Sequence, residues 1–425
     1  MRPETDKFLW GAATSSHQVE GNNYLNDWWQ WELASKTTAK SGIACDQYNR
    51  FREDFEIAKN LGHNAHRLSL EWSRLEPEKN KWDDNAFDHY RDVIAYLQHL
   101  GIEPIITLNH FTLPMWLAKE GGWSLRKSRF YFENFAKKVI EKLGDLGTYW
   151  IAINEPMILA FLSYFVGSWP PGESNIHKML NVIENQMHAH VKAYKVMHET
   201  AKKIHGKKIL VGIAKEAAMI TPCNKNYLTN FMPAFWRHHF YNHLFIRAIK
   251  YGWLIFPGYY LEMLPYGNAL DFIGLNYYRR FHIKYTGFGP LKMFGDQCAC
   301  PEHNELVEKN SMGWEIYPEG LYEIIKSFSQ YNLPIIITEN GIPTDNEADR
   351  IKFIKTHLDA VQKAKKRGHP VMGYLHWSLI DNFEWADGFW PHFGLVGIDY
   401  HTQKRTVRES GRFYSDYIKK IGLAI

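Results

Sequence analysis

The chain has 425 residues, a length that fits two or three domains or one large α/β barrel. Its 50 Lys and Arg residues nearly balance 46 Asp and Glu residues, and the formal net charge of +4 gives no electrostatic reason to expect nucleic acid or an anionic membrane as a partner. Hydrophobic residues make up 45% of the chain, which excludes global disorder. Aromatic residues make up 15%, and this excess suits a site that stacks flat rings on a ligand.

The N-terminal residues and the cysteines bear on where the protein works. No apolar segment of the signal-peptide type follows Met1, and no run of about 18 apolar residues occurs, so we expect a cytoplasmic protein without a membrane partner. Four cysteines are too few for a disulfide scaffold. Cys298 and Cys300 lack a second pair at zinc spacing, and we predict free thiols in a loop. His239 and His243 stand at i and i+4 without a zinc-protease glutamate, and we place them on a helix surface, so no metal or cofactor is expected.

Short apolar runs alternate along the chain with longer amphipathic stretches. The runs predict strands at Leu9–Ala13, Ala65–Ser69, Pro104–Leu108, Tyr149–Ile153, Ile209–Ala214, Phe272–Leu275, Ile335–Thr338 and Val371–His376. Apolar spacing predicts helices over Asp84–His99, Phe130–Leu143, Met179–Ile204, Glu319–Tyr331 and Asp349–Arg367. No linker or internal repeat divides the sequence, so we predict an α/β fold in which residues 1–425 form a single (β/α)8 TIM barrel. A doubly wound protein of two domains is the alternative, but no G-x-G-x-x-G motif follows the first strand.

Polar side chains follow nearly every predicted strand. In a (β/α)8 barrel, functional residues gather just past the C-terminal ends of the strands. The polar residues at these places are Gln18, Glu20, Arg67, Asn109, His110, Asn154, Glu155, Asn276, Tyr278, Glu339, Asn340 and Glu384. Because buried polar groups cost free energy unless they are paired, stability alone does not account for so many of them.

Two of these residues are glutamates that we expect to face each other across the ring, Glu155 after the fourth strand and Glu339 after the seventh. Repulsion between two such carboxylates raises the pKa of one, which can stay protonated near neutral pH. In this fold, Arg67 and Tyr278 are placed to keep the other one ionised. The asymmetry supplies an acid and a nucleophile for glycosidic chemistry, with retention at a carboxyl gap of ~5–5.5 Å and inversion at ~6.5–9.5 Å.

The motifs around these residues resemble glycoside hydrolase family 1, the retaining β-glycosidases of clan A. The resemblance covers nearly the whole chain and rests on many separate motifs in the family order. They are FLWGAAT from Phe8, QVEG from Gln18, RLSLEWSR from Arg67, TLNHFTLPMWL from Thr107, NEP from Asn154, DFIGLNYY from Asp271, MGWEIYPEGL from Met312, PIIITENG from Pro334, GYLHWSLIDNFEWADG from Gly373 and FGLVGIDY from Phe393.

The resemblance implies a retaining exo-β-glycosidase acting on terminal β-D-glucosyl residues, with β-galactosyl and β-fucosyl side activity. Glu339 would be the nucleophile, and Glu155 would be the general acid and then the base that activates water. Supporting roles at the catalytic pair fall to Arg67, Asn154, Asn276 and Tyr278. Contacts with the sugar or the aglycone fall to Gln18, His110, Trp314, Trp377, Glu384, Trp385 and Phe393. The partners would be small-molecule β-glycosides and oligosaccharides, and the sequence leaves a homo-oligomer open.

Glu384 bears on which substrates fit. A carboxylate there accepts hydrogen bonds from free 4- and 6-hydroxyls and repels a phosphate dianion, which disfavours the phospho-glycosidase branch of the family.

The stretches 222–268 and 285–312 are short for the family, and short loops should leave the outer subsites open to varied aglycones. Two alternatives stay open: a transglycosylase that uses the same two glutamates, and a non-catalytic sugar-binding member, which typically loses one of them.

Overall fold

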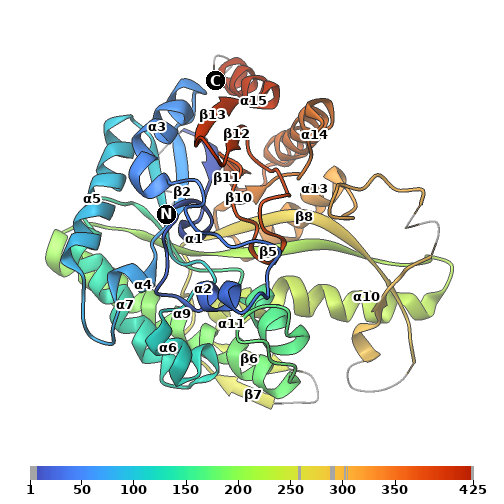
Figure 1. The fold of residues 1–425 in the computed structure, drawn as a ribbon. Coiled ribbons are helices and arrows are strands. Elements are labelled where there is room, and N and C mark those ends of the chain that lie inside the picture. The colour runs from blue at the N-terminus through green and yellow to red at the C-terminus, as the bar shows by residue number, and fades with distance from the viewer. Residues whose placement is uncertain (1–6, 257–259, 288–291, 301–302, 304, 423–425) are drawn as a thin grey trace.

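The computed structural model describes residues 7–256, 260–287, 292–300, 303 and 305–422. Parallel strands form a closed ring in the order β10-β11-β1-β2-β3-β4-β5-β8, which closes because β8 pairs with β10 (Figure 1). The strands of this ring are β1 (Leu9–Ala13), β2 (Ala65–Ser69), β3 (Glu103–Asn109), β4 (Tyr149–Asn154), β5 (Leu210–Pro222), β8 (Phe272–Lys284), β10 (Ile335–Asn340) and β11 (Val371–Trp377). The other strands are β6 (Trp253–Phe256), β7 (Tyr260–Met263), β9 (Asp296–Gln297), β12 (Val396–Asp399) and β13 (Lys404–Val407). The predicted (β/α)8 barrel is confirmed.

Helices surround the ring (Figure 1). They are α1 (Ser16–Val19), α2 (Asp27–Leu33), α3 (Gln47–Asn60), α4 (Trp72–Leu75), α5 (Asp84–His99), α6 (Met115–Glu120), α7 (Ser128–Leu143), α8 (Pro156–Phe161), α9 (Ile176–His205), α10 (Phe231–His238), α11 (Leu244–Tyr251), α13 (Pro318–Phe328), α14 (Glu347–Lys366) and α15 (Glu409–Gly422). Helix α5 has the predicted bounds because Asp83 caps its first turn, accepting from the backbone N–H groups of Asn85 and Ala86. Helix α9 ends at Gly206, whose left-handed backbone (φ 62°) stops the helix.

The interior of the ring is filled by aliphatic and aromatic side chains. One buried cluster takes a side chain from every strand of the ring, namely Leu9, Ala65, Ile105, Tyr149, Ile151, Ala214, Phe272, Ile336 and Leu375. A parallel ring buried on both faces needs such continuously apolar strands. The polar residues that follow them along the strands are therefore collected at one end of a closed, packed barrel.

Strands β5 and β8 are much longer than predicted. They pair in parallel from Gly212 with Phe272 to Pro222 with Ile283, and they run beyond the ring toward α10 (Figure 1). The prediction ended both strands early because charged residues, such as Lys215 and Arg279, interrupt the apolar pattern there. Each strand gains its length from pairing with the other, which a local pattern does not reveal.

The end of β5 and the segment after β9 bring three cysteines together. Cys223 and Cys298 are joined in a disulfide, and the sulfur of Cys300 lies 2.9 Å from that of Cys298. The prediction of free thiols is therefore wrong for Cys298. Its partner stands 75 positions earlier in the chain, and only the pairing of the two long strands brings the residues together.

The histidine pair in the segment after α10 also differs from the prediction. His243 is buried, where Nδ1 lies 2.8 Å from the Tyr331 hydroxyl and Nε2 lies 2.9 Å from Ser327 Oγ. The surface placement is thus wrong for His243, because α13 and the turn after it cover this segment.

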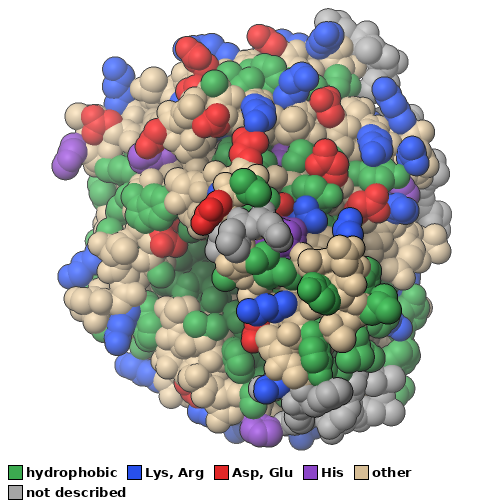
Figure 2. All heavy atoms as spheres, turned by 90° about the vertical axis from the view of Figure 1, so that its right-hand side faces the viewer, with side chains coloured by type: hydrophobic (Ala, Val, Ile, Leu, Met, Phe, Trp, Pro, Cys, Tyr) green, Lys and Arg blue, Asp and Glu red, His purple; other side chains and the backbone are tan. Residues whose placement is uncertain are grey.

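Part of the surface is apolar. On the face shown in Figure 2, hydrophobic side chains are exposed between charged ones. Helix α10 and the turn before it expose large hydrophobic side chains, with Leu228 at 84% and Phe235 at 55%. Of the helices within the described ranges, none combines the length and the apolarity that a bilayer crossing requires.

Candidate active site

A cavity of about 360 Å³, open to solvent, lies at the C-terminal ends of the strands. Ten of the predicted site residues line it: Gln18, His110, Glu155, Tyr278, Trp314, Glu339, Trp377, Glu384, Trp385 and Phe393. Arg67, Asn154 and Asn276 are buried behind this lining and hydrogen-bonded to one another or to the two glutamates. The structure therefore brings the whole predicted set into one place.

Glu339 lies near the end of strand β10 and accepts hydrogen bonds from two side chains, those of Arg67 and Tyr278. Arg67 donates from Nη1 to one carboxylate oxygen, and the Tyr278 hydroxyl donates to the other at 2.7 Å. The guanidinium is itself fixed, since Nε donates to Thr107 Oγ1 at 3.0 Å and Nη2 donates to Asn154 Oδ1 at 2.7 Å. A buried cation with all its partners in place fixes both the position and the negative charge of Glu339.

Glu155 is held differently, by an amide rather than by a cation. It begins helix α8 ahead of Pro156 with a left-handed backbone (φ 45°), a conformation that costs a non-glycine residue about 1–3 kcal/mol and that recurs at functional sites. Asn276 Nδ2 donates to its Oε1 at 2.6 Å. The Thr338 hydroxyl donates to Asn276 Oδ1 at 2.6 Å, which turns the amide nitrogen toward Glu155.

These surroundings give the carboxyl groups of Glu155 and Glu339 different affinities for a proton. Burial raises the pKa of Glu155 well above its usual range, and the negative charges of Glu339 and Glu216 raise it further. Burial also raises the pKa of Glu339, but Arg67 and Tyr278 oppose the rise. A single proton shared by the pair therefore resides on Glu155, while Glu339 is anionic.

His110 lies between two tryptophans. Its ring is 14° from the plane of Trp377 and 10° from that of Trp385, at 6.1 Å from each. Burial and the nearby Arg67 lower the pKa of His110 well below its usual range, so the imidazole is neutral. Asn154 Nδ2 donates to His110 Nε2 at 3.3 Å, which leaves the proton on Nδ1. That N–H group is buried and has no hydrogen-bond partner among the described residues.

Gln18 and Glu384 form a second polar pair in the cavity. Gln18 Nε2 donates to Glu384 Oε2 at 3.1 Å and to Asn382 Oδ1 at 3.0 Å. Burial, followed by the charges of Asp387 and Glu339, raises the pKa of Glu384 to about 8. The two side chains offer both a donor and an acceptor to a polyhydroxylated ligand.

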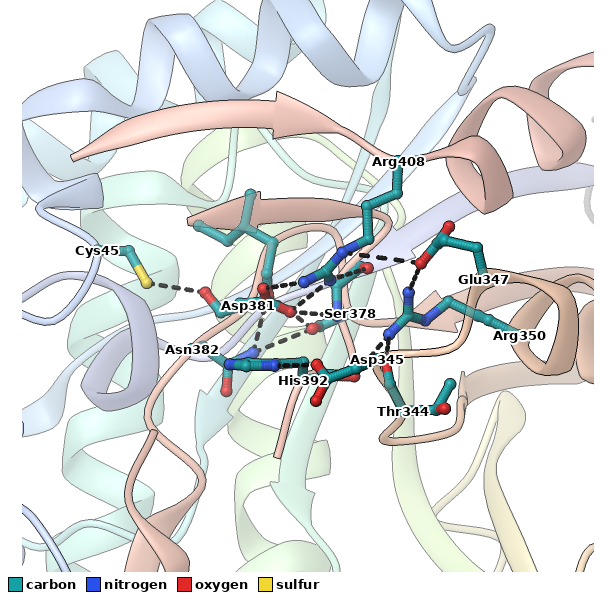
Figure 3. Close-up of polar contacts among 12 residues, drawn as sticks. Cys45, Thr344, Asp345, Glu347, Arg350, Ser378, Asp381, Asn382, His392 and Arg408 are labelled. Atoms are coloured by element: carbon teal, nitrogen blue, oxygen red, sulfur yellow. Dashed lines mark hydrogen bonds and ion pairs between the residues drawn. The ribbon is translucent and has the colours of Figure 1, made fainter. Parts of the chain in front are cut away.

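The loop that carries Glu384 is fixed by a network from later parts of the chain (Figure 3). Arg408, which follows β13, donates to the two carboxylate oxygens of Asp381 at 2.8 and 2.7 Å. One of these oxygens also accepts from the backbone N–H of Gly394 at 2.9 Å, beside Phe393. Such a bidentate, largely buried ion pair sets the positions of both Glu384 and Phe393.

Trp314 borders the outer part of the cavity. Its ring centroid lies 5.7 Å from that of Tyr278 and 6.4 Å from that of Phe393. The Arg279 guanidinium stands 4.9 Å from the Trp314 ring. Aromatic rings and one cation thus line this part of the cavity.

Several lining residues were absent from the prediction, and Glu216 is the most telling of them. It lies on β5, the one strand for which no polar end residue was predicted. Glu216 is buried, accepts a hydrogen bond from the Tyr241 hydroxyl and lies 3.8 Å from Arg279. The dipeptide Lys215-Glu216, placed directly after an apolar run, was the signal that could have found it.

Comparisons with known proteins agree with this geometry. The family model described as Glycosyl hydrolase family 1 matches residues 3–423. A 1,4-beta-D-glucan glucohydrolase from Thermotoga neapolitana is 35% identical over 455 residues, covering 100% of both chains. The solved structure of a beta-glycosidase from Pyrococcus horikoshii superposes with a TM-score of 0.90 at 38% identity, over 98% of this chain and 94% of that one.

A beta-glucosidase from Thermotoga maritima in complex with glucoimidazole superposes with a TM-score of 0.88 at 32% identity, over 99% of each chain. The family model and the full-length relatives agree on one assignment: the chain belongs to glycosyl hydrolase family 1 and is a glycosidase.

Proposed function

We propose that the protein is a retaining exo-β-glycosidase that hydrolyses terminal β-D-glucosyl residues, with β-galactosides and β-fucosides as further substrates. The observation that carries this proposal is the unequal environment of the two carboxyl groups. Glu339 contacts a buried arginine and a tyrosine hydroxyl, whereas the Glu155 carboxyl accepts a hydrogen bond from the amide of Asn276. The names of the glucan glucohydrolase and beta-glucosidase relatives support the glucosyl preference.

Both reaction steps follow from this arrangement. In the first, the Glu339 carboxylate attacks the anomeric carbon and the bond to the leaving group breaks, while Glu155 gives its proton to the departing oxygen. In the second, the Glu155 carboxylate takes a proton from water, and the water oxygen attacks the glycosyl ester on Glu339. Glu339 leaves as a carboxylate, and the sugar is released with its original anomeric configuration.

The polar set in the cavity supports binding of one unmodified sugar ring. We expect Gln18, His110 and Glu384 to hydrogen-bond the sugar hydroxyls and Trp377 to supply a flat apolar face. For Asn154, beside the catalytic pair, we propose a contact with the sugar 2-hydroxyl that strengthens as the transition state forms. The presence of both glutamates argues against a non-catalytic sugar-binding role. A cytoplasmic location and a homo-oligomer stay predictions from the sequence.

A panel of nitrophenyl glycosides, with cellobiose and lactose beside them, tests the proposed function. We expect the highest kcat/KM for β-glucosides, lower but measurable values for β-galactosides and β-fucosides, and no turnover of α-glucosides or 6-phosphorylated β-glucosides. The groups that shift the pKa of Glu384 are Asp387, Glu339, Gln18 and Trp377, and none of them is a cation that would neutralise a phosphate dianion. Preferred turnover of a phosphorylated glycoside would contradict the proposal.

Aryl and alkyl glucosides in the same panel test the open outer subsites. We expect similar specificity constants across them, and one sharply preferred aglycone would contradict that expectation.

Glu216→Gln is expected to move the alkaline limb of the kcat/KM–pH profile to lower pH. The charge of Glu216 raises the pKa of Glu155, so its removal lowers that pKa, and the protonated acid is lost earlier as the pH rises. The measurement is kcat/KM against pH for an alkyl glucoside, whose poor leaving group needs the acid.

Asp387→Asn is the matched control, since Asp387 lies in the same cavity and affects the pKa of Glu384 rather than that of Glu155. An alkaline limb that stays in place or moves upward in Glu216→Gln would show that Glu216 does not act on the acid.

A further inference from the structure

Three cysteines and one histidine lie close together outside the catalytic cavity. Cys223 follows β5, Cys298 and Cys300 follow β9, and His303 stands three positions further along. A sulfur atom from each cysteine and one imidazole nitrogen all lie within 4.8 Å of one another. We call these four residues the cysteine–histidine cluster, and no step of the glycosidase mechanism uses them.

The composition and the size of the cluster match a tetrahedral metal site. Three thiolates and one imidazole are a common ligand set of structural zinc, with Zn–S distances of ~2.3 Å and Zn–N distances of ~2.0–2.1 Å. Four such ligand atoms around one ion stand roughly 3.5–3.8 Å apart. The sulfurs of Cys223 and Cys300 already stand 3.5 Å apart, near this spacing, and all four ligand atoms lie within 4.8 Å of one another. The Cys298 sulfur, which is bonded to that of Cys223 and lies 2.9 Å from that of Cys300, has to move outward once the disulfide is opened.

The backbone around the cluster is already fixed by strand β8. The Cys223 N–H group donates to the Ile283 carbonyl at 2.8 Å, and the Cys298 N–H group donates to the His282 carbonyl at 2.7 Å. The segment carrying Cys298 extends β9, which pairs with the end of β8. Two ligands from distant parts of the sequence are thus held by one strand before any ion arrives.

The imidazole of His303 is oriented in the manner usual for metal-binding histidines. Its Nε2–H group donates to the Cys223 carbonyl at 2.7 Å, so the lone pair is on Nδ1. Ligating histidines generally donate their second N–H group to a carbonyl or carboxylate in this way. The ring also stacks on His282 at 3.6 Å with 6° between the planes, and His282 lies 2.7 Å from a carboxylate oxygen of Glu315.

We propose that the cysteine–histidine cluster, in its thiol form, binds one zinc ion through three thiolates and a neutral imidazole. The disulfide between Cys223 and Cys298 is the alternative state of the same residues. A dithiol reductant opens it. The reductant gives up two electrons and two protons and is oxidised to its own disulfide, and Cys223 and Cys298 become thiols. Zinc then displaces three protons from the three thiols.

Such an ion would be structural, because four protein ligands leave no position for water. It would join the end of β5 to the segment after β9. Through the stack of His303 on His282 and the contact of His282 with Glu315, it would also steady the residue next to Trp314 at the cavity border.

The test measures metal and thiols in the full-length protein purified with a dithiol reductant after growth in zinc-supplemented medium. We expect one zinc per chain by mass spectrometry of the metal, and four thiols per unfolded chain once the zinc is chelated. Cobalt added in place of zinc should give the intense visible absorption of a tetrahedral thiolate site. Chelation of the native protein should lower the midpoint of thermal unfolding, and added zinc should restore it.

Cys300→Ser and His303→Ala should each lower zinc affinity at least tenfold, on the scale seen even for residues that only support metal ligands. Both variants should keep turnover of p-nitrophenyl β-D-glucoside, which reports that they fold. Cys45→Ser is the matched control, since Cys45 is buried elsewhere beside Asp381 and should leave the zinc content unchanged. Protein that binds neither zinc nor cobalt in the reduced state, or that keeps a Cys223–Cys298 cross-link in the presence of zinc and reductant, would overturn the proposal.

Discussion

Glu339→Ala is expected to lower kcat for p-nitrophenyl β-D-glucoside by a factor on the order of 10⁵ or more, because no other group can form the glycosyl ester. Added azide should restore part of the rate. The small anion occupies the space left by the carboxylate and attacks the anomeric carbon from the same side. The product of this single displacement is the α-glycosyl azide, with inverted configuration, and NMR of the product distinguishes it.

The control for this variant is Glu323→Ala, which removes a partly exposed glutamate of α13 that pairs with Lys326 at 3.4 Å. We expect near-normal kcat from it, because exposed ion pairs contribute little. Near-normal hydrolysis by Glu339→Ala, or azide products with retained configuration, would falsify the assignment of the nucleophile.

Glu155→Ala is expected to act according to the leaving group. Loss of a general acid costs ~10²–10⁴-fold for alkyl glycosides and cellobiose, whose leaving oxygens need a proton. Dinitrophenyl glucoside should lose far less in its first step, because its leaving group departs as a stable anion. A plot of log kcat/KM against the pKa of the leaving alcohol should therefore have a steeper slope for the variant than for the wild type.

The pH profile of the same variant gives a second readout. Burial and the charge of Glu339 raise the pKa of Glu155, so the wild-type alkaline limb marks loss of its proton as the pH rises. This limb should disappear in Glu155→Ala. An equal loss for all leaving groups, with the alkaline limb unchanged, would assign the acid to another residue. Asn276→Ala serves as a comparison, since it removes the amide that contacts Glu155 but leaves the carboxyl group in place.

The barrel was predictable because its strands are buried on both faces. The predicted strand Ile335–Thr338 begins with three isoleucines, and helix α5 combines a regular apolar spacing with a capping aspartate. The extensions of β5 and β8 were not predictable in the same way. Their charged residues are tolerated because each strand satisfies the other's backbone, and that pairing joins segments about 60 positions apart in the sequence.

The candidate site was likewise predictable only where its residues follow from the local sequence pattern. Residues such as Glu155 and Glu339 lie at strand ends that the pattern locates, so their convergence in one cavity follows from the fold. Glu216 was missed because the predicted strand ended two residues before it. The contact between Cys223 and Cys298 was missed because both residues are held by strand β8, and their spacing along the chain does not reveal such a contact.

The ion pair between Arg408 and Asp381 has a consequence for how the protein is made. Synthesis proceeds from the N-terminus, so Glu155 and Glu339, the proposed catalytic pair, leave the ribosome before Arg408 does. Strand β1 also lacks a late contact until α15 is made, because the Tyr414 hydroxyl of α15 donates to the Gly11 carbonyl at 3.1 Å. With the proposed roles, a chain still attached to the ribosome holds both reacting carboxyl groups while the loop of Glu384 lacks its anchor, and we expect hydrolysis to begin only after the last helix has docked.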